Sequence, residues 1–444
     1  MKKICSVFLV LVILVGAALL PAGAVGYTPS FEVYAEAAYI VNLDTNIIVY
    51  EKESETPMVA ASLVKMMTCI LLLESYQDQL DSISVTSPAY IYDILYGKNA
   101  STADIRSGET VTLRQLLYAM LLPSGNEAAY MVADYMGGGS IDNFVARMNS
   151  TAQKLGCTGT VFTDPCGLDE GNMITARDAY LILRYAMSFD AFVEACGTPS
   201  YYMGENPRYA SGTYYLHTTN KMLPGANGAE FTRSYNQGGK TGTLGDWQNF
   251  AGWHTQNGET YISVVLHSPD SCEPYDYPTE RPALYETGEL MDWIYDTFSV
   301  HAAFDISEPL TEIPVKYSTQ TDSIILYPAD GLMTLLPIEG DGSESVKIFD
   351  LPESVAAPIK AGDVIGTVTL QLSGQELGTV DLIATTDVAR NDFLFVLAKI
   401  GEFFSTTYFK VFLLTTLVLV GGYAALYTIA TRQYRNSRRQ NKRR

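Results

Sequence analysis

The sequence predicts an α/β domain whose sheet is interrupted by a helical segment, followed by a small β-rich domain and one C-terminal transmembrane helix. Three observations lead to this class. Strand-like runs stand near both ends of residues 39–302, helical periodicity fills the space between them, and an uncharged apolar run covers residues 411–431. The chain has 444 residues, 47% of them hydrophobic, which is enough for two or three folded units with a sizeable core.

The first predicted domain, residues 39–302, begins with a hairpin around Asp44 and Thr45. Apolar residues at helical spacing then predict five helices, at residues 60–73, 114–122, 127–135, 141–155 and 176–187. Strand-like character returns from Thr241 onward, with runs at residues 250–254 and 261–266 and a long helix at 282–298. Because strands stand on both sides of the helices, we expect one sheet built from both ends of the domain, with a helical subdomain inserted.

The second predicted domain, residues 303–389, is β-rich. Short strand-like runs occupy residues 313–317, 323–327 and 346–349, and residues 364–372 and 376–382 read as a hairpin. This segment contains no catalytic constellation, so we expect a spacer or a partner surface. In the juxtamembrane segment, residues 390–410, apolar side chains recur at helical spacing, which is consistent with a helix on the membrane surface or with a packed linker helix.

The two ends of the chain predict its cellular location. Residues 1–24 have a short basic start, an apolar run and a small-residue site at Ala22-Gly23-Ala24, which is the pattern of a cleaved signal peptide. Residues 411–431 are long enough to cross a membrane, and the tail at 432–444 carries seven Lys or Arg residues. The positive-inside bias then predicts a cytoplasmic tail and an extracytoplasmic body on a single-pass cell-membrane protein.

The charge of the body excludes one class of partner. The formal net charge is −20, but the signal-like start and the tail hold nine of the 29 basic residues and no acidic ones. The rest of the chain therefore sets 20 basic against 49 acidic side chains, a net charge of −29. Such a body repels polyanions, so we expect no nucleic-acid partner.

Histidine and cysteine predict neither a metal site nor a cofactor. The four histidines show no metal-ligand spacing, and no G-x-S-x-G motif surrounds any serine. Cys157 and Cys166 stand close enough in sequence to form a disulfide, although spacing alone does not establish a pairing.

A serine and a lysine lie one helical turn apart in the run Ser62-Leu63-Val64-Lys65. Residues three apart share a helix face, so the lysine nitrogen can reach the serine hydroxyl. A serine hydroxyl needs a neighbouring base to become a nucleophile, and a lysine can serve when burial lowers its pKa. By itself the S-x-x-K pattern is weak, because an ordinary serine at the start of a helix gives the same letters.

Two further motifs change that balance. Ser124-Gly125-Asn126 stands in a loop between two predicted helices, and Lys240-Thr241-Gly242-Thr243 opens the strand-rich return. Small residues beside the lysine allow a substrate backbone to lie close to the strand. In this order, S-x-x-K, S-x-N and K-T-G form the three-motif pattern of penicillin-binding proteins and serine β-lactamases.

The chain resembles low-molecular-mass penicillin-binding proteins of the serine-type D-alanyl-D-alanine carboxypeptidase family, peptidase family S11. The resemblance runs from residue 39 to residue 388 and is carried by stretches around and beyond the motifs. These stretches are residues 60–68, 144–156, 162–168, 175–178, 219–223 and 357–366. The resemblance implies a β-lactamase/transpeptidase-like sheet with a helical subdomain, followed by that family's C-terminal β domain.

The resemblance also implies roles for the motif residues. Ser62 is the nucleophile, Lys65 its base and Ser124 a proton relay to the leaving amine. Asn126 holds the peptide, and Lys240, Thr241, Gly242 and Thr243 bind the substrate around its terminal carboxylate. The backbone amides of Ser62 and Thr243 are the implied oxyanion donors.

The implied substrate is a peptidoglycan pentapeptide ending in D-Ala-D-Ala, with β-lactam antibiotics as covalent inhibitors and the membrane as a partner of the C-terminal helix. Two features depart from the family pattern. Thr243 stands where many members carry an aromatic residue or histidine, and the spanning helix with its basic tail exceeds the usual amphipathic anchor. A β-lactamase, a D,D-endopeptidase or transpeptidase, and a catalytically silent wall-binding module remain as alternatives. Class A β-lactamases use a glutamate for deacylation. Glu170 falls in a loop at a suitable distance, but an ordinary exposed loop acid explains it better, so we expect no counterpart of that glutamate.

Overall fold

The computed structural model describes residues 28–269, 281–338, 345–372 and 375–441. It divides into two compact units. The first contains the described residues up to Ala302 together with those of 333–346 and 371–377, and the second contains the rest. The predicted signal peptide, residues 1–24, lies outside the described residues.

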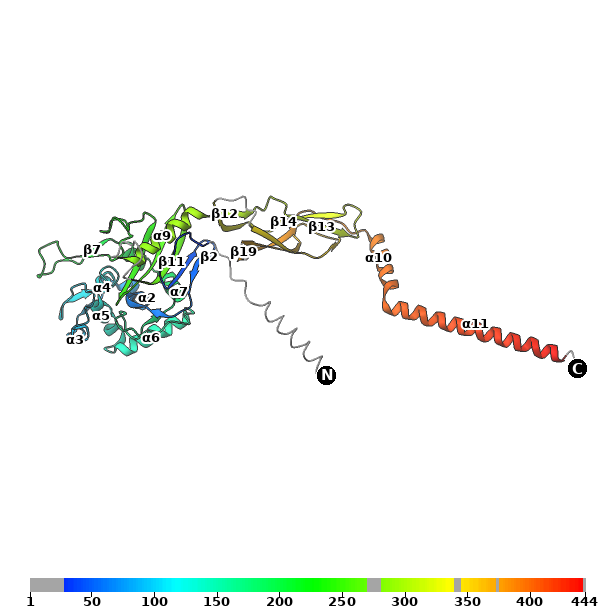
Figure 1. Cartoon of the computed structure of the whole chain (residues 1–444), viewed down its shortest axis with the longest axis horizontal. Coiled ribbons are helices and arrows are strands. Elements are labelled where there is room, and N and C mark those ends of the chain that lie inside the picture. Colours follow the sequence, from blue (N-terminus) through cyan, green and yellow to red (C-terminus); the bar gives the residue numbers. More distant parts are fainter. Residues whose placement is uncertain (1–27, 270–280, 339–344, 373–374, 442–444) are drawn as a thin grey trace. The chain divides into compact units, whose positions relative to one another are not determined.

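The first unit is built on an antiparallel sheet of five strands in the order β2-β1-β11-β10-β9 (Figure 1). The strands are β1 (Ala37–Asn42), β2 (Ile48–Lys52), β9 (Asn236–Leu244), β10 (Trp247–Gln256) and β11 (Glu259–Pro269). The first strand of the chain pairs along its whole length with β11, from Ala37 opposite Leu266 to Asn42 opposite Tyr261. The sheet therefore joins the two ends of the domain, as the sequence predicted.

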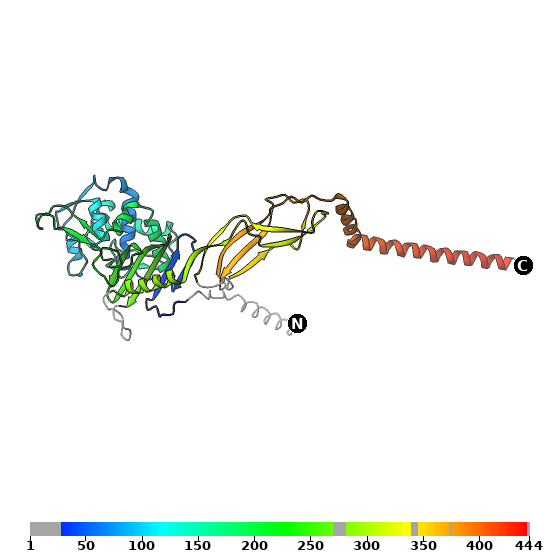
Figure 2. The same cartoon turned by 90° about the horizontal axis from the view of Figure 1, so that it is seen from above.

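Helices cover both faces of this sheet, so its central strands are buried on both sides. Alternate residues of β1 pack in opposite directions: Tyr39 and Val41 join the core beneath the helical subdomain, whereas Ala38 and Ile40 join a second core with α9 (Pro282–Thr297). Figure 2 shows the helical subdomain and α9 with the sheet between them. The predicted α/β class with a helical insertion is confirmed.

The helical subdomain follows the predicted helices closely. Its helices are α2 (Val64–Tyr76), α3 (Tyr90–Leu95), α4 (Leu113–Leu121), α5 (Asn126–Gly137), α6 (Ile141–Lys154), α7 (Ala176–Ala186) and α8 (Asp190–Cys196), with short 3-10 turns η1 (Ala61–Leu63) and η2 (Gln77–Gln79). The first ten residues of α2, from Val64 to Leu73, are all buried, as expected for a helix that is apolar on every side. A capping box between Thr112 and Gln115 fixes the start of α4.

Three short two-stranded ribbons complete the subdomain, and the sequence patterns missed all of them. They are β3 (Met58–Val59) with β6 (Met173–Ile174), β4 (Ser84–Thr86) with β5 (Thr110–Thr112), and β7 (Ser200–Tyr202) with β8 (Tyr215–His217). Runs of two or three residues are too short to show a period of two, which is why they gave no signal.

The second unit is β-rich, as predicted. Its six-stranded sheet has the order β16-β18-β19-β14-β13-β17. The strands are β13 (Thr311–Lys316), β14 (Ser323–Pro328), β16 (Ser345–Asp350), β17 (Val355–Ala356), β18 (Val364–Leu372) and β19 (Gln375–Ala384). A separate pair joins β12 (Phe298–Phe304) to β15 (Leu332–Pro337), and most of its residues belong to the first unit.

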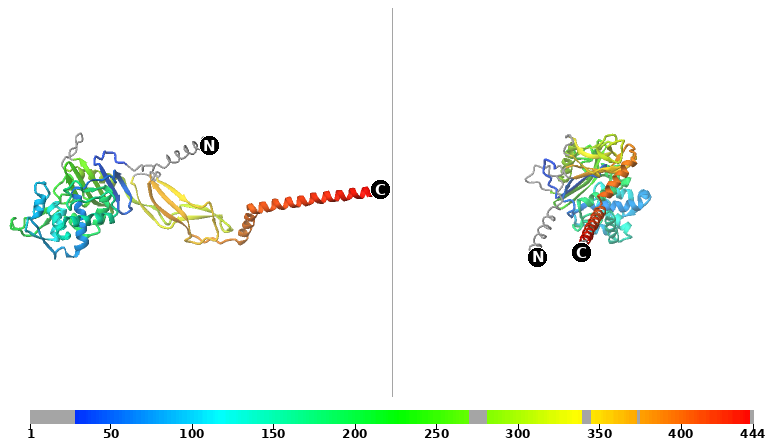
Figure 3. Two further views of the ribbon diagram at one scale, coloured as in Figure 1. Left: turned by 90° about the horizontal axis from the view of Figure 1, so that it is seen from below. Right: turned by 90° about the vertical axis from the view of Figure 1, so that its right-hand side faces the viewer.

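Two helices follow the strands of the second unit, α10 (Asp392–Ser405) and α11 (Thr407–Asn441), drawn in orange and red in Figure 3. Within α11, the segment Thr407–Asn436 is long and apolar enough to cross a membrane, and it includes the predicted span at residues 411–431. In the described part of the chain it is the one such helix.

Candidate active site

Ser62 and Lys65 lie where a 3-10 turn passes into helix α2. The sequence predicted one continuous helix from residue 60, but Ser62 belongs to η1 and the α-helix begins at Val64. The turn still brings the two side chains together, with 2.9 Å between Lys65 Nζ and Ser62 Oγ. Ser62 is partly accessible, whereas Lys65 is fully buried. A reachable hydroxyl beside a buried amine is the arrangement that a lysine-activated nucleophile requires.

Lys65 Nζ also contacts two other oxygens, Asn126 Oδ1 at 2.9 Å and the Cys166 carbonyl at 2.7 Å. Burial lowers the pKa of Lys65, although the carboxylates of Asp164 and Glu127 act in the opposite direction. A neutral amine has two N–H bonds and one lone pair. In that neutral form the two fixed acceptors can take both N–H bonds, which leaves the lone pair for the Ser62 hydroxyl; the protonated form donates to Ser62 Oγ instead. This geometry is compatible with Lys65 acting as a base once it is neutral.

The Cys166 carbonyl is held in place by Asp164, a residue that the sequence patterns did not single out. The Asp164 carboxylate accepts hydrogen bonds from four successive backbone N–H groups, those of residues 166 to 169. Gly167 lies so close to the nucleophile turn that a Cβ atom there would meet the Ala61 carbonyl oxygen at 1.8 Å. The loop thus packs directly against the segment that carries Ser62.

Ser124 lies in the turn between α4 and α5, and Asn126 is the first residue of α5. Ser124 has a φ of +62°, which is rare for a residue with a side chain, and its hydroxyl accepts a hydrogen bond from Lys240 Nζ at 3.0 Å. Asn126 donates through Nδ2 to the Ser101 carbonyl at 2.9 Å. Its amide oxygen therefore faces Lys65 while its amide nitrogen is fixed behind it.

The K-T-G motif lies on β9, at the edge of the sheet. Lys240 is buried, and burial together with the nearby charge of Lys65 lowers its pKa to about 7. Thr241 Oγ1 is 2.6 Å from Thr219 Oγ1, and Thr243 is exposed to solvent. A Cβ atom on Gly242 would stand 3.2 Å from the Ala60 carbonyl oxygen, so only a minimal side chain lets this strand run beside the nucleophile turn.

The structure thus brings the three motifs together, through the contacts of Lys65 with Ser62 and Asn126 and of Lys240 with Ser124. It adds Asn249 on β10, which the sequence patterns missed. The Asn249 amide donates to the Val59 and Ala60 carbonyls and accepts from the His267 backbone N–H at 2.8 Å. This side chain ties the sheet to the residues just before Ser62.

Other candidates from the sequence are structural or exposed. Glu170 is exposed on its loop. Cys157 and Cys166 are free thiols, so the disulfide considered for them is wrong. His254 is buried against Ser263, and burial lowers its pKa to about 3, which keeps it neutral. Among the described residues no group of His, Cys, Asp and Glu is arranged to hold a metal ion.

A partly accessible serine paired with a buried lysine, and a second buried lysine on the edge strand, form the kind of site that serine acyl-enzymes with S-x-x-K and K-T-G motifs use. Residues 24–270 match the sequence model of the D-alanyl-D-alanine carboxypeptidases, peptidase family S11, and residues 295–390 match that of the C-terminal domain of penicillin-binding protein 5. The chain therefore belongs to peptidase family S11, and it is a serine peptidase.

Individual relatives agree with this assignment. D-alanyl-D-alanine carboxypeptidase DacF of Bacillus subtilis is 24% identical over 369 residues, which cover 82% of this chain and 88% of the relative. The D-alanyl-D-alanine carboxypeptidase of Streptomyces sp. K15 is 34% identical over 195 residues, covering 41% of this chain and 67% of that protein. The crystal structure of penicillin binding protein 5 from Haemophilus influenzae shares the fold, with a TM-score of 0.57 and 22% identity over 82% of this chain and all of that one.

Proposed function

We propose that this protein removes the terminal D-alanine from peptidoglycan stem peptides through an acyl-enzyme on Ser62, and that penicillins acylate the same serine. The observation that carries the proposal is the 2.9 Å contact between Ser62 Oγ and a lysine nitrogen whose other two contacts are fixed backbone and amide acceptors.

In the acylation step, Lys65 takes the Ser62 hydroxyl proton while Oγ attacks the carbonyl carbon between the two terminal D-alanines. The amides of Ser62 and Thr243 receive the oxyanion, and such donors typically stabilise a transition state by roughly 3–4 kcal/mol each. The C–N bond breaks as Ser124 donates a proton to the leaving nitrogen, and the proton held by Lys65 restores Ser124. Water then hydrolyses the ester and releases the shortened peptide. No cofactor takes part.

Lys240 recognises the terminal carboxylate together with Thr241 and Thr243, because charge-assisted hydrogen bonds to a carboxylate are short and strong. Asn126 holds the peptide, and Gly242 leaves room for its backbone beside β9. A bound carboxylate raises the pKa of Lys240 from its lowered value of about 7, so binding recharges this lysine.

We infer further that the enzyme is exported by its signal peptide and held by α11, with the body outside and the basic tail in the cytoplasm. The length of the apolar segment and the arginine-rich tail support this orientation. Protease added to protoplasts then digests the body and spares a small C-terminal fragment. Protection of the body contradicts the orientation.

Incubation with a D-Ala-D-Ala pentapeptide and with a fluorescent penicillin tests the proposed activity. We expect release of one D-alanine per pentapeptide and a penicilloyl adduct that persists for minutes. Glu170 is exposed, and the buried Glu127 accepts hydrogen bonds from Thr102, Ala103 and Ile105, so neither is placed like the deacylating glutamate of class A β-lactamases. Rapid penicillin hydrolysis without D-alanine release favours a β-lactamase. Transfer to an added amine or cleavage of a cross-link favours a transpeptidase or an endopeptidase, and failure to label favours the silent wall-binding module.

A further inference from the structure

The turn that holds Asn126 from behind has no regular secondary structure. It runs from Ser101 to Glu109, between α3 and β5, and its Ser101 carbonyl accepts both from the Asn126 backbone N–H and from Asn126 Nδ2, each at 2.9 Å. Asn126 is buried and its amide oxygen contacts Lys65. The orientation of this amide, and with it one of the two N–H acceptors of Lys65, therefore depends on where the turn places a single carbonyl group.

From the inside, the turn is held by Glu127, the residue after Asn126. Glu127 is buried, and its Oε1 accepts from the Thr102 hydroxyl at 2.8 Å, from the Ala103 N–H at 2.7 Å and from the Ile105 N–H at 3.3 Å. These contacts fix the start of the turn but end at residue 105. Asp104 has a φ of +60°, a left-handed conformation that a non-glycine residue keeps only when its surroundings enforce it.

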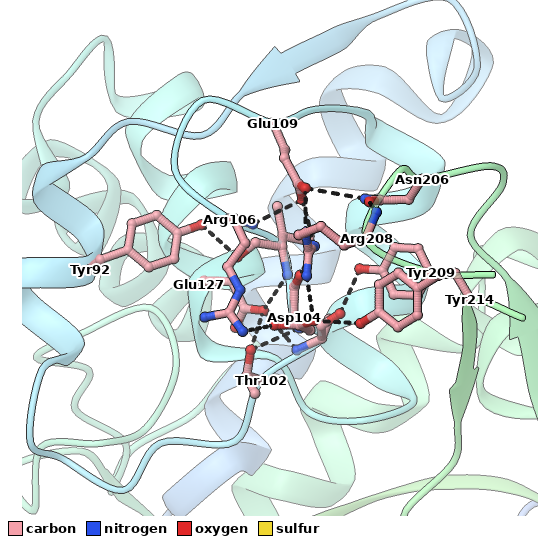
Figure 4. A network of polar contacts seen from close by, with 12 residues as sticks. Tyr92, Thr102, Asp104, Arg106, Glu109, Glu127, Asn206, Arg208, Tyr209 and Tyr214 are labelled. Carbon is pink, nitrogen blue, oxygen red and sulfur yellow. Dashed lines mark hydrogen bonds and ion pairs between the residues drawn. The ribbon is translucent and has the colours of Figure 1, made fainter.

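From the outside, the turn is held by the hairpin between β7 and β8, and Arg208 makes most of the contacts (Figure 4). Its guanidinium donates to both carboxylate oxygens of Glu109, through Nε at 2.8 Å and Nη2 at 3.0 Å. The same group donates to the Asp104 carboxylate and to the Asp104 carbonyl. One side chain thus joins the middle of the turn to its end.

Two tyrosines of the same hairpin support this contact. Tyr209 donates to the Asp104 carboxylate, Tyr214 donates to the Ala103 carbonyl at 2.7 Å, and the two rings stack with centroids 4.1 Å apart. Tyr214 is buried. The hairpin leads through β8 to Thr219, whose hydroxyl contacts Thr241, so the hairpin and the turn are both connected to the site.

We propose that Arg208 is a positioning residue for the acylation reaction: by closing the hairpin onto the turn at Asp104 and Glu109, it fixes the Ser101 carbonyl and through it the Asn126 amide. The proposal rests on the proposed function of Ser62 and Asn126. The ion pairs are partly exposed, with 32% of the Arg208 side chain and 25% of the Glu109 side chain accessible, so salt weakens them. Arg208 itself contacts no substrate.

Arg208→Gln tests this proposal, with Arg114→Gln as a matched control. Arg114 makes an equally bidentate ion pair with Asp81, at 2.7 and 2.9 Å, and this pair has no bond to the turn. The two arginine side chains are similarly exposed, at 29% and 32%, although Asp81 is more exposed than Glu109. We expect Arg208→Gln to lower the second-order rate of acylation by a penicillin roughly 5- to 20-fold, and Arg114→Gln to lower it less than about twofold. High salt reduces the difference between Arg208→Gln and the wild type.

A double-mutant cycle separates positioning from a general loss of structure. In an Asn126→Ala background, whose slow labelling is followed over hours, Arg208→Gln has no further effect on the acylation rate, because the amide that it positions is gone. Arg208→Lys keeps one charge-assisted contact and recovers part of the rate.

Equal effects of the two arginine variants, or a full additional loss in the Asn126→Ala background, overturn the role of Arg208. Failure of the wild type to be acylated at all instead overturns the proposed function, so the two failures are distinguishable.

Discussion

The two units of this protein differ in how many charged and polar side chains they bury. The first unit buries six charged side chains, Lys65, Glu127, Asp164, Asp178, Lys240 and Glu286. In the described residues of the second unit, Ser318 is the one polar side chain that is buried. Its sheet is filled by aliphatic residues such as Ile324, Leu326 and Val368.

Burying a charge costs several kcal/mol unless it is compensated, so buried charges need an explanation. The four acidic side chains are compensated by hydrogen bonds from backbone N–H groups. Asp164 and Glu127 hold loops of the active site in this way. Asp178 accepts from two N–H groups and a hydroxyl near Gly159, and Glu286 accepts from the N–H groups of Tyr34 and Ala35. The two lysines are different. Burial lowers the pKa of both, which costs stability, and lowered lysine pKa values are typical of functional sites.

Replacement of Lys65 is expected to change the rate of penicillin acylation most, and an exposed lysine of the second unit provides the comparison. Lys65→Met removes the base while keeping the volume of the side chain, and general-base catalysis typically contributes about 10²–10⁴-fold. We expect penicillin acylation to slow by about 10³-fold. Lys360→Met, which removes an exposed lysine of the second unit, serves as the control and leaves the rate unchanged. Equal rates for Lys65→Met and the wild type contradict the role of Lys65.

The dependence on pH tests the second buried lysine. Its pKa is lowered to about 7, so in the free enzyme Lys240 loses its charge as the pH rises through that value, and kcat/KM for a carboxylate-bearing peptide falls on the basic side. Lys240→Arg keeps its charge at all these pH values, so its basic limb moves to higher pH even if its rate is lower. An unchanged basic limb contradicts carboxylate binding by Lys240.

Lys240 is expected to lower the free energy of unfolding, although the proposed activity needs it. The folded state holds Lys240 with a pKa of about 7 while the unfolded state keeps the ordinary lysine value. The destabilisation from this lysine is therefore fully present below about pH 7 and fades as the pH rises toward the unfolded-state pKa. We expect Lys240→Met to raise the free energy of unfolding by about 1–3 kcal/mol at pH 7 while activity is lost. Thermal unfolding at pH 7 and pH 10 measures this. A destabilised variant at pH 7 shows that the lysine is a net structural asset.

The smallest effect is expected from the second unit. A chain that ends before Asn391 lacks α10 and α11 but keeps every residue of the proposed site. Its kcat/KM on a soluble pentapeptide should lie within about twofold of the full chain, because neither helix contributes a group to the chemistry. A large loss in a folded, truncated enzyme shows that the membrane segment affects the site.

Residue type and spacing predicted the sheet, six helices of the first domain and the eight motif residues of the site. They did not predict the contacts that a backbone carbonyl or N–H group makes. The acceptors for Lys65 and Asn126 include the carbonyls of Cys166 and Ser101, and a carbonyl is present at every position whatever the side chain. Asp164 left one trace, since it lies in the Phe162–Leu168 stretch that resembles the family, but its four N–H contacts depend on the loop conformation.

The hairpin that carries Arg208 was also beyond prediction. Its strands β7 and β8 have three residues each, and Arg208 meets Asp104 and Glu109 across about a hundred residues of sequence. Ion pairs between distant segments give no local pattern. Similarly, the 3-10 turn at Ser62 was predicted as helix because its apolar neighbours follow the helical period up to the turn.

The central claim is that Ser62 carries the acyl group. Intact-mass measurement after incubation with a penicillin, followed by peptide mapping of the adduct, tests it directly. We predict one penicilloyl group per chain, located on the peptide that contains Ser62, and no adduct on a folded Ser62→Ala variant. An adduct on another residue, or equal labelling of the alanine variant, contradicts the claim.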